Sequence, residues 1–226
     1  MNDDIKIYYN NLALTYDENR FENSYGKYID FQERKFLKSI LPTIKKHKIL
    51  DLGCGTGRFL DFANYGIDIS LKMIEIAKEK FPEKEINEGS VVQISYPENF
   101  FDFIYSFHVI MHLDKEITQS FLDETYTKLK PKGKLIFDFP SKKRRKIVNY
   151  KAKNWHAANQ FSLKEIEEIS GNKWKVTQYK GILFLPIHRI PKIIRPLFLP
   201  IDAFLCNSFL KEYASYLIVV LEKNEL

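Results

Sequence analysis

The sequence predicts an α/β fold in which helices cover both faces of a mostly parallel β-sheet. Short apolar runs alternate along the chain with stretches in which apolar residues recur at helical spacing. A cluster of glycines follows the first clear apolar run, and YLIVVLEK near the C-terminus is the strongest strand-like segment. Repeated strand-then-helix units of this kind are typical of a parallel sheet buried on both sides.

The first half of the chain predicts two helices and two strands. Apolar spacing over 29–41 indicates a helix that Pro42 stops, and Ser70 is placed to cap a second helix. Between them, two short apolar runs are separated by the glycine cluster, which leaves room for only a brief helix. The expected elements are helices at 29–41 and 70–80 and strands at 48–52 and 65–68.

The second half continues the alternation. KPKG, at 130–133, is expected to end a helix, and Ser162 with Glu165 fits a capping box that opens the next helix. β-Rich composition marks the other segments. The expected elements are helices at 117–129 and 162–171 and strands at 102–107, 134–139, 175–185 and 216–223.

Composition limits the class of protein. The chain has 226 residues, of which 45% are hydrophobic and 28% charged, as is ordinary for one globular domain. Only two cysteines are present, far apart in sequence, so they predict no zinc cluster and no disulfide framework. We find neither a secretory signal nor a run of ~18 apolar residues, and expect a cytoplasmic protein. The net charge of +6 favours anionic partners.

The stretch KILDLGCGTGRFL lies where the first strand ends. In a parallel sheet, ligands bind beyond the carboxyl ends of the strands. Gly53, Gly55 and Gly57 let the backbone turn tightly and let a ligand approach closely. Asp68 ends the second strand, from where its carboxylate can accept hydrogen bonds from both ribose hydroxyls. The pattern therefore predicts a nucleoside-containing cofactor.

The order of the glycines indicates which cofactor. A dinucleotide fingerprint reads GxGxxG and leaves room for a pyrophosphate, whereas here Asp51 opens the loop and the spaced third glycine is missing. A carboxylate at that place repels a pyrophosphate and attracts an ammonium group.

At these residues the chain resembles the class I S-adenosylmethionine-dependent methyltransferases, and most closely small-molecule O-methyltransferases of the ubiquinone-biosynthesis and sugar-modifying type. DLGCGTG is similar to the family's first motif and GIDIS to its ribose-binding strand end. EGSVVQISYPENFFDFIYSFHVIMHL and KLKPKGKLIFDF correspond to the later motifs in the same order. The resemblance implies a Rossmann-like three-layer sandwich with seven strands, the last of them antiparallel.

The resemblance also implies a site for S-adenosylmethionine, with S-adenosylhomocysteine as product. Asp51 and the Gly53–Gly57 loop would surround the methionine portion, and Asp68 would hold the ribose. Ser90 stands where the family commonly has an Asp that accepts from the adenine amino group, so a backbone group or water would replace that contact. The implied cofactor residues are Asp51, Gly53, Cys54, Gly55, Thr56, Gly57, Asp68, Ile69, Met73, Ser90, Val91 and Phe107.

A general base would assist transfer to an alcohol or phenol, and histidine is the usual choice because its pKa is near neutral. His108 and His112 follow the fourth strand, and His156 follows the fifth. We take His112 and His156 as the catalytic candidates, although each also fits a structural role. The segment HVIMH lacks the Glu that accompanies His in the quinone branch, so no metal is expected.

We expect one methyltransferase domain over 1–226, with a helical lid at 1–45 and a Pro-rich apolar insertion at 186–212. Its prolines are expected to break regular structure. The insertion fits an acceptor pocket, a homodimer surface, ordinary core packing, or a membrane-touching flap with Arg189, Lys192 and Arg195. The basic run 142–146 fits a bound anionic acceptor, RNA, or a solvated loop.

Three functions follow from these observations. The first is methyl transfer to a small-molecule acceptor, anionic or apolar, at a hydroxyl of a sugar, quinone-like or lipid-linked compound. The second is tRNA or rRNA nucleoside methylation, which the basic charge favours but which lacks an added RNA-binding domain and an NPPY-type motif. The third is a cofactor-binding partner subunit without catalysis. The retained glycines and acids argue against it, since a chain that no longer bound cofactor would have no physical need for them.

Overall fold

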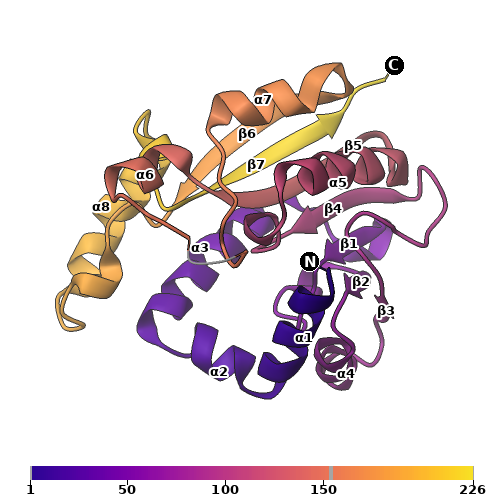
Figure 1. The fold of residues 1–226 in the computed structure, drawn as a ribbon, viewed down its shortest axis with the longest axis horizontal. Helices are drawn as coiled ribbons and strands as arrows, with labels where there is room; N and C mark the ends of the chain where they lie inside the picture. The colour runs from indigo at the N-terminus through magenta and orange to yellow at the C-terminus, as the bar shows by residue number, and fades with distance from the viewer. Residues whose placement is uncertain (1, 153–154, 226) are drawn as a thin grey trace.

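The computed structural model describes residues 2–152 and 155–225, which fold around one seven-stranded sheet (Figure 1). The strand order is β3-β2-β1-β4-β5-β7-β6. All neighbouring pairs are parallel except those of β7, which runs antiparallel to β5 and β6. The predicted fold is therefore confirmed. The strands are β1 Ile49–Leu52, β2 Tyr65–Asp68, β3 Glu85–Glu88, β4 Phe101–Ser106, β5 Leu129–Pro140, β6 Trp174–Ile182 and β7 Tyr216–Lys223.

Helices lie on both faces of this sheet, and three of them precede the first strand. The Ser70 hydroxyl accepts from the Met73 backbone N–H at 3.3 Å, and Ser162 with Glu165 forms the predicted capping box. The α-helices are α1 Asn2–Leu12, α2 Tyr16–Phe21, α3 Ser24–Ile40, α4 Leu71–Lys80, α5 Lys115–Lys128, α6 Lys142–Ile147, α7 Leu163–Ser170 and α8 Arg195–Asn207.

Short 3-10 helices fill several connections. Between the glycine loop and β2 there is only η3, so the brief helix expected there is a single turn. The short helices are η1 Ala13–Thr15, η2 Ile44–Lys46, η3 Leu60–Phe62, η4 Ile110–His112, η5 Gly171–Lys173, η6 Ile187–Arg189 and η7 Lys211–Tyr213.

Three boundaries differ from the prediction. Helix α3 begins at Ser24 because Asn23 caps it, accepting from two backbone N–H groups. Strand β5 begins at Leu129 and not at 134, so KPKG lies within the strand. Leu129 pairs with Phe101, and the register shifts between Phe101 and Phe103. The expectation that prolines break the insertion is wrong for α8, which holds Pro196 in its first turn, where no N–H partner is needed, and Pro200 inside.

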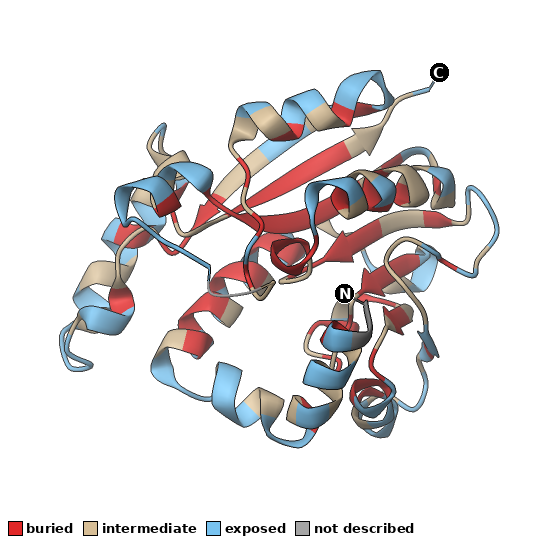
Figure 2. Cartoon of the chain, viewed as in Figure 1, coloured by how far each residue is buried: buried red, intermediate tan, exposed pale blue. Residues whose placement is uncertain are grey.

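The hydrophobic core forms two layers, one on each face of the sheet. Every residue of β1 is buried, as is most of β4 and β5 (Figure 2). Phe36 and Leu37 of α3 pack with Ile74 of α4 on one face. Phe121 of α5 and Ile166 of α7 pack on the other. Within the described residues, no helix is long and apolar enough to cross a bilayer.

Because β1 pairs in parallel with both β2 and β4, the carboxyl ends of these three strands meet at one edge of the sheet. Helices α1 and α2 approach this edge.

Candidate functional site

The loop after β1 is held open by glycine. Gly53, Gly55 and Gly57 have φ angles of 82°, 53° and 88°, which side chains disfavour. A Cβ on Gly53 would lie 2.4 Å from Cγ2 of Val109, so the loop also approaches the end of β4 too closely for any side chain. The positive φ angles and this close approach explain why β1 is followed by a loop rich in glycine.

Asp68 joins the ends of β1 and β2. Its Oδ2 accepts from the Gly55 N–H at 2.8 Å, and its Oδ1 accepts from the Ser70 N–H at 2.8 Å. Burial raises the pKa of Asp68, although these N–H groups oppose the rise. The carboxylate thus positions the glycine loop and faces the same cavity as the loop does.

That cavity lies at the carboxyl ends of β1, β2 and β4, where ligands of parallel sheets bind. Ile5 and Tyr9 of α1 and Tyr16 of α2 form part of its wall. Sequence patterns did not single out these three residues. Of the predicted site residues, those that line the cavity are Gly53, Gly55, Asp68, Ile69, Met73, Ser90, Val91, Phe107 and His112.

A smaller adjoining cavity shares Tyr16, Gly53, Gly55 and Phe107 with the first. The remaining loop residues line it, namely Asp51, Cys54 and Thr56. Gly57 lines neither cavity, and a Cβ there would lie 3.1 Å from the Phe81 ring. The glycine therefore serves packing as well as the turn.

Asp51 lies at the end of this smaller cavity and is buried. Burial raises the pKa of Asp51 well above its usual range, Arg58 opposes the rise, and Asp68 adds to it. A buried carboxyl of this kind is stabilised in its charged form by a cation bound beside it. It fits the ammonium group that the sequence predicts there.

The N-terminal helices are fastened over the cofactor loop. The Ser70 hydroxyl donates to Asn10 Oδ1 at 2.7 Å, and Lys6 pairs with Glu88 at 2.5 Å. From α2, Asp17 accepts from the Thr56 hydroxyl at 2.6 Å and from Lys80 at 2.5 Å. These contacts connect α1 and α2 to the loop after β1, to α4 and to the end of β3.

His112 is buried in η4, with both ring nitrogens bonded. Nδ1 accepts from the Ala157 N–H at 3.2 Å, so the neutral ring carries its proton on Nε2, which lies 2.9 Å from the Tyr9 hydroxyl. Burial, together with the nearby His156 and Arg20, lowers the pKa of His112 to about 3. In this arrangement His112 is a neutral hydrogen-bond donor. Neither ring nitrogen is free to take up a proton from a methyl acceptor.

His156 lies behind His112 and outside the cavity wall. The two rings are 4.5 Å apart, and Tyr8 and Trp155 pack on the other sides of His156. Burial lowers its pKa too. Nδ1 of His156 is buried and has no hydrogen-bond partner within the part of the chain that the structure describes.

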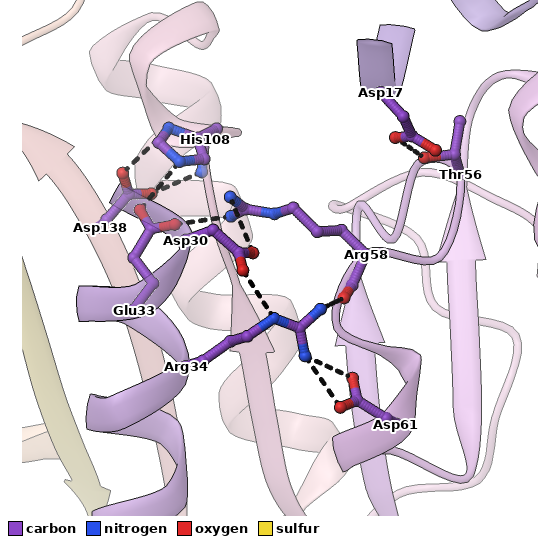
Figure 3. A network of polar contacts seen from close by, with 9 residues as sticks. All are labelled: Asp17, Asp30, Glu33, Arg34, Thr56, Arg58, Asp61, His108 and Asp138. Carbon is purple, nitrogen blue, oxygen red and sulfur yellow. Dashed lines mark hydrogen bonds and ion pairs between the residues drawn. The ribbon is translucent and has the colours of Figure 1, made fainter. Parts of the chain in front are cut away.

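A second polar cluster, which the sequence did not predict, surrounds His108 at the cavity wall (Figure 3). Its Nε2 lies 2.9 Å from Glu33 Oε1 of α3, and its Nδ1 lies 3.5 Å from Asp138 Oδ2 of β5. Arg58 pairs with Glu33 at 2.7 Å. Burial would raise the pKa of Glu33, but His108 and Arg58 outweigh it and lower the pKa.

Ligand atoms of Glu33, His108 and Asp138 lie within 4.8 Å of one another, so the three groups could hold a metal ion. Arg58 already supplies a cation beside Glu33 and so compensates part of the negative charge of the cluster. The sequence expectation of a site without a metal stays a prediction.

The chain is similar in sequence to known methyltransferases. Residues 50–137 match the family model described as a methyltransferase domain. Phosphoethanolamine N-methyltransferase of Plasmodium falciparum is 32% identical over 130 residues, which cover 51% of this chain and 49% of that protein. Demethylmenaquinone methyltransferase of Oceanobacillus iheyensis is 29% identical over 142 residues, which cover 51% and 58%. The chain thus spans about half the length of the curated relatives it matches.

Among solved structures, a SAM-dependent methyltransferase of Thermotoga maritima, described as a possible histamine N-methyltransferase, superposes with a TM-score of 0.69. The superposition covers 94% of this chain and 98% of that one at 18% sequence identity. At this identity the likeness supports the fold, including the part of the chain outside residues 50–137.

Proposed function

We propose that this chain is an S-adenosylmethionine-dependent methyltransferase that transfers a methyl group to a small-molecule acceptor bound under its N-terminal helices. The match of residues 50–137 to the methyltransferase-domain model supports this enzyme class and cofactor. Because the relatives are matched over about half their length, the acceptor is part of the proposal.

The enclosure of the main cavity carries the proposal. Tyr9 and Tyr16 stand over the cofactor residues, and α1 is fastened to β3 and α4. A cavity walled in this way admits a small acceptor and keeps water from the sulfonium. A nucleoside within an RNA chain would have to displace both helices. For this reason we rank RNA methylation below a small-molecule reaction.

Within the cavity, we assign Asp51 to the ammonium of the methionine portion and Asp68 to the ribose. Ile69 and Met73 would contact the adenine, and Ser90 and Val91 would lie at its edge. The two carboxylates stand at opposite sides of the glycine loop, which fits a ligand with a cation at one end and a ribose at the other. The methyl group would then lie near Phe107, and in-line attack needs only a positioned nucleophile.

Which atom of the acceptor is methylated depends on which group takes up the proton of that atom. For a hydroxyl, the expected base was His112, but both its nitrogens are bonded while α1 is closed. An oxygen acceptor would therefore have to replace Tyr9 at Nε2 or lose its proton elsewhere. We retain a hydroxyl as the first candidate, with Tyr9 and His112 as the group that orients it.

An amine is the second candidate, because an amine can lose its proton to water before it binds and needs no base in the site. Two of the proteins compared above are named as N-methyltransferases, which supports testing it. Arg20 of α2 lies near enough to His112 and His156 to lower the pKa of both. Its positive charge would favour an acceptor that carries an anionic group.

Calorimetric titration with S-adenosylhomocysteine tests the cofactor site. Asp68→Ala should weaken binding by about 1.5–3 kcal/mol, since it removes a charged acceptor of ribose hydrogen bonds. Asp123→Ala, which removes an exposed carboxylate on α5, is the matched control. Equal affinity of the two variants would contradict the ribose assignment.

An acceptor screen tests the reaction itself. Release of S-adenosylhomocysteine would be measured with a catechol, a sugar and phosphoethanolamine. Turnover of a small compound supports the proposal, and its class distinguishes oxygen from nitrogen. Tight cofactor binding without turnover of any compound would favour a partner subunit, and co-purified nucleic acid with turnover of RNA would favour the nucleoside reaction.

A further inference from the structure

Positive charge is concentrated in two segments outside the cofactor site. Residues 141–160 and 186–211 contain eleven of the 35 Lys and Arg residues but only one of the 29 Asp and Glu residues. These 46 positions therefore carry a net charge of +10, and the other 180 carry −4, which together give the net +6. The basic character of the chain belongs to one region.

Helices α6 and α8, which belong to these two segments, lie together at one end of the molecule (Figure 1). The Ser141 hydroxyl donates to the Glu212 backbone oxygen, and Lys143 pairs with the Glu212 side chain. Arg144 of α6 also contributes to lowering the pKa of His188 in η6. Arg144 therefore lies near enough to η6 to act on His188 electrostatically.

Apolar side chains protrude from the same end of the molecule. Leu197, Ile201 and Phe204 follow helical spacing along α8 and are 72%, 51% and 73% exposed. Further exposed apolar residues flank this stripe on the preceding turn, on the loop after α8 and on the end of α6. They are Ile193, Phe209, Ile147 and Val148.

The opposite side of α8 is fixed to the domain. Asp202, fully buried, accepts from the Tyr28 hydroxyl at 2.7 Å, from Gln32 Nε2 at 2.9 Å and from the Leu185 N–H at 2.6 Å. Cys206, one turn later, is also fully buried. The apolar stripe is thus presented outward by a helix whose orientation is set by buried contacts, and Figure 2 shows most of α8 exposed.

We propose that α8, η6 and α6 form a surface that docks peripherally on an anionic lipid bilayer. An amphipathic helix inserts its apolar face at the headgroup boundary, and surrounding Lys and Arg residues bind anionic headgroups. Both parts are present here, because α8 carries the apolar stripe and the neighbouring elements carry cations, namely Arg144 and Lys146 in α6, Arg189 in η6 and Lys192 before α8.

Two other occupants fit the same surface less well. RNA would be bound by the cations, but it gains little from exposed Leu and Ile side chains, since nucleic-acid sites combine positive charge with aromatic stacking. A second copy of the chain would bring the same positive region against itself in a symmetric interface, where like charges repel. A bilayer with anionic lipids satisfies both the apolar and the charged groups.

Vesicle co-sedimentation tests the proposal. The protein should bind vesicles of phosphatidylcholine mixed with phosphatidylglycerol at least about tenfold more than phosphatidylcholine alone, and high salt should reduce binding. Leu197→Asp combined with Phe204→Asp should abolish binding. Phe31→Asp, on an exposed apolar residue of α3, is the control and should bind like the unmodified protein.

Arg189→Glu with Lys192→Glu should also lose binding, and this charge reversal leaves the apolar stripe intact. Titration with S-adenosylhomocysteine shows that each variant is folded. No binding to the anionic vesicles, or binding that persists in both double variants, would overturn the proposal. It would also be overturned if light scattering found a dimer that Leu197→Asp with Phe204→Asp dissociates while vesicle binding is unchanged.

Discussion

At the scale of single residues, the proposed cofactor site is built from groups that are close in sequence or meet across adjacent strands. Asp68 reaches Gly55 because β1 and β2 pair in parallel register and end side by side. The position of both residues could be predicted because a motif at one strand end and an acid at the next are brought together by the sheet itself.

His112 provides a prediction about pH at this scale. Its pKa is about 3 in the folded protein and near 6.5 in the unfolded chain. Below pH 6.5 the unfolded chain therefore binds a proton at this residue, and the folded protein does not. Stability from this group is complete above pH 6.5 and falls as the pH drops toward 3. Between pH 7 and pH 5 the loss should be about 2 kcal/mol.

His112→Asn should remove this part of the pH dependence. Urea unfolding at pH 7 and pH 5 measures it, and the difference between the two pH values should shrink by about 2 kcal/mol in the variant. His47→Asn, at an exposed histidine before β1, is the control. An unchanged pH dependence in His112→Asn would mean that the ring is hydrated or protonated in the folded protein.

At the scale of elements, α2 is held over the cofactor loop mainly through Asp17, which bonds to Thr56 and Lys80. Asp17→Ala should open the lid more often and raise the dissociation rate of S-adenosylhomocysteine roughly fivefold, the equivalent of about 1 kcal/mol. Stopped-flow displacement measures the rate. Glu18→Ala, at the exposed neighbouring position, should leave the rate unchanged, and equal rates in both variants would exclude this role for Asp17.

The attachment of α8 gives a second prediction at this scale. Asp202→Ala leaves the Tyr28 hydroxyl, the Gln32 amide and the Leu185 N–H without their acceptor in a buried place. The free energy of unfolding should fall by about 2–4 kcal/mol. Urea denaturation measures this loss, whereas Asp123→Ala should change the value by less than about 0.5 kcal/mol. A small effect at both sites would show that water reaches the Asp202 pocket.

At the scale of the whole molecule, cofactor binding and folding are linked. S-Adenosylhomocysteine at about 100 times its Kd should stabilise the protein by about 2.7 kcal/mol, because only the folded chain holds the site. For a domain of this size, Tm should rise by about 5–10 °C. Differential scanning calorimetry measures the shift, which should fall below half in Asp68→Ala at the same concentration. A shift of equal size in that variant would place the ligand elsewhere.

The fold was largely predictable because its signals are local. Ser70 and Ser162 cap the helices they were expected to cap, and YGID and YLIVVLEK are strands with the expected bounds. The errors fall where tertiary pairing overrides local preference. KPKG has the composition of a turn, but its neighbour Leu129 joins the ladder opposite Phe101.

By itself, the sequence determined the α/β fold, the glycine loop and the two acids that flank it, because each depends on periodicity or on a motif within one or two elements. Only the tertiary structure decided the surroundings of the histidines and of α8. Tyr9 meets His112 across 103 positions, and Tyr28 meets Asp202 across 174. Spacing along the chain reports which face of an element is buried, but not which distant side chain packs against it, since that is set by how whole helices dock on the sheet.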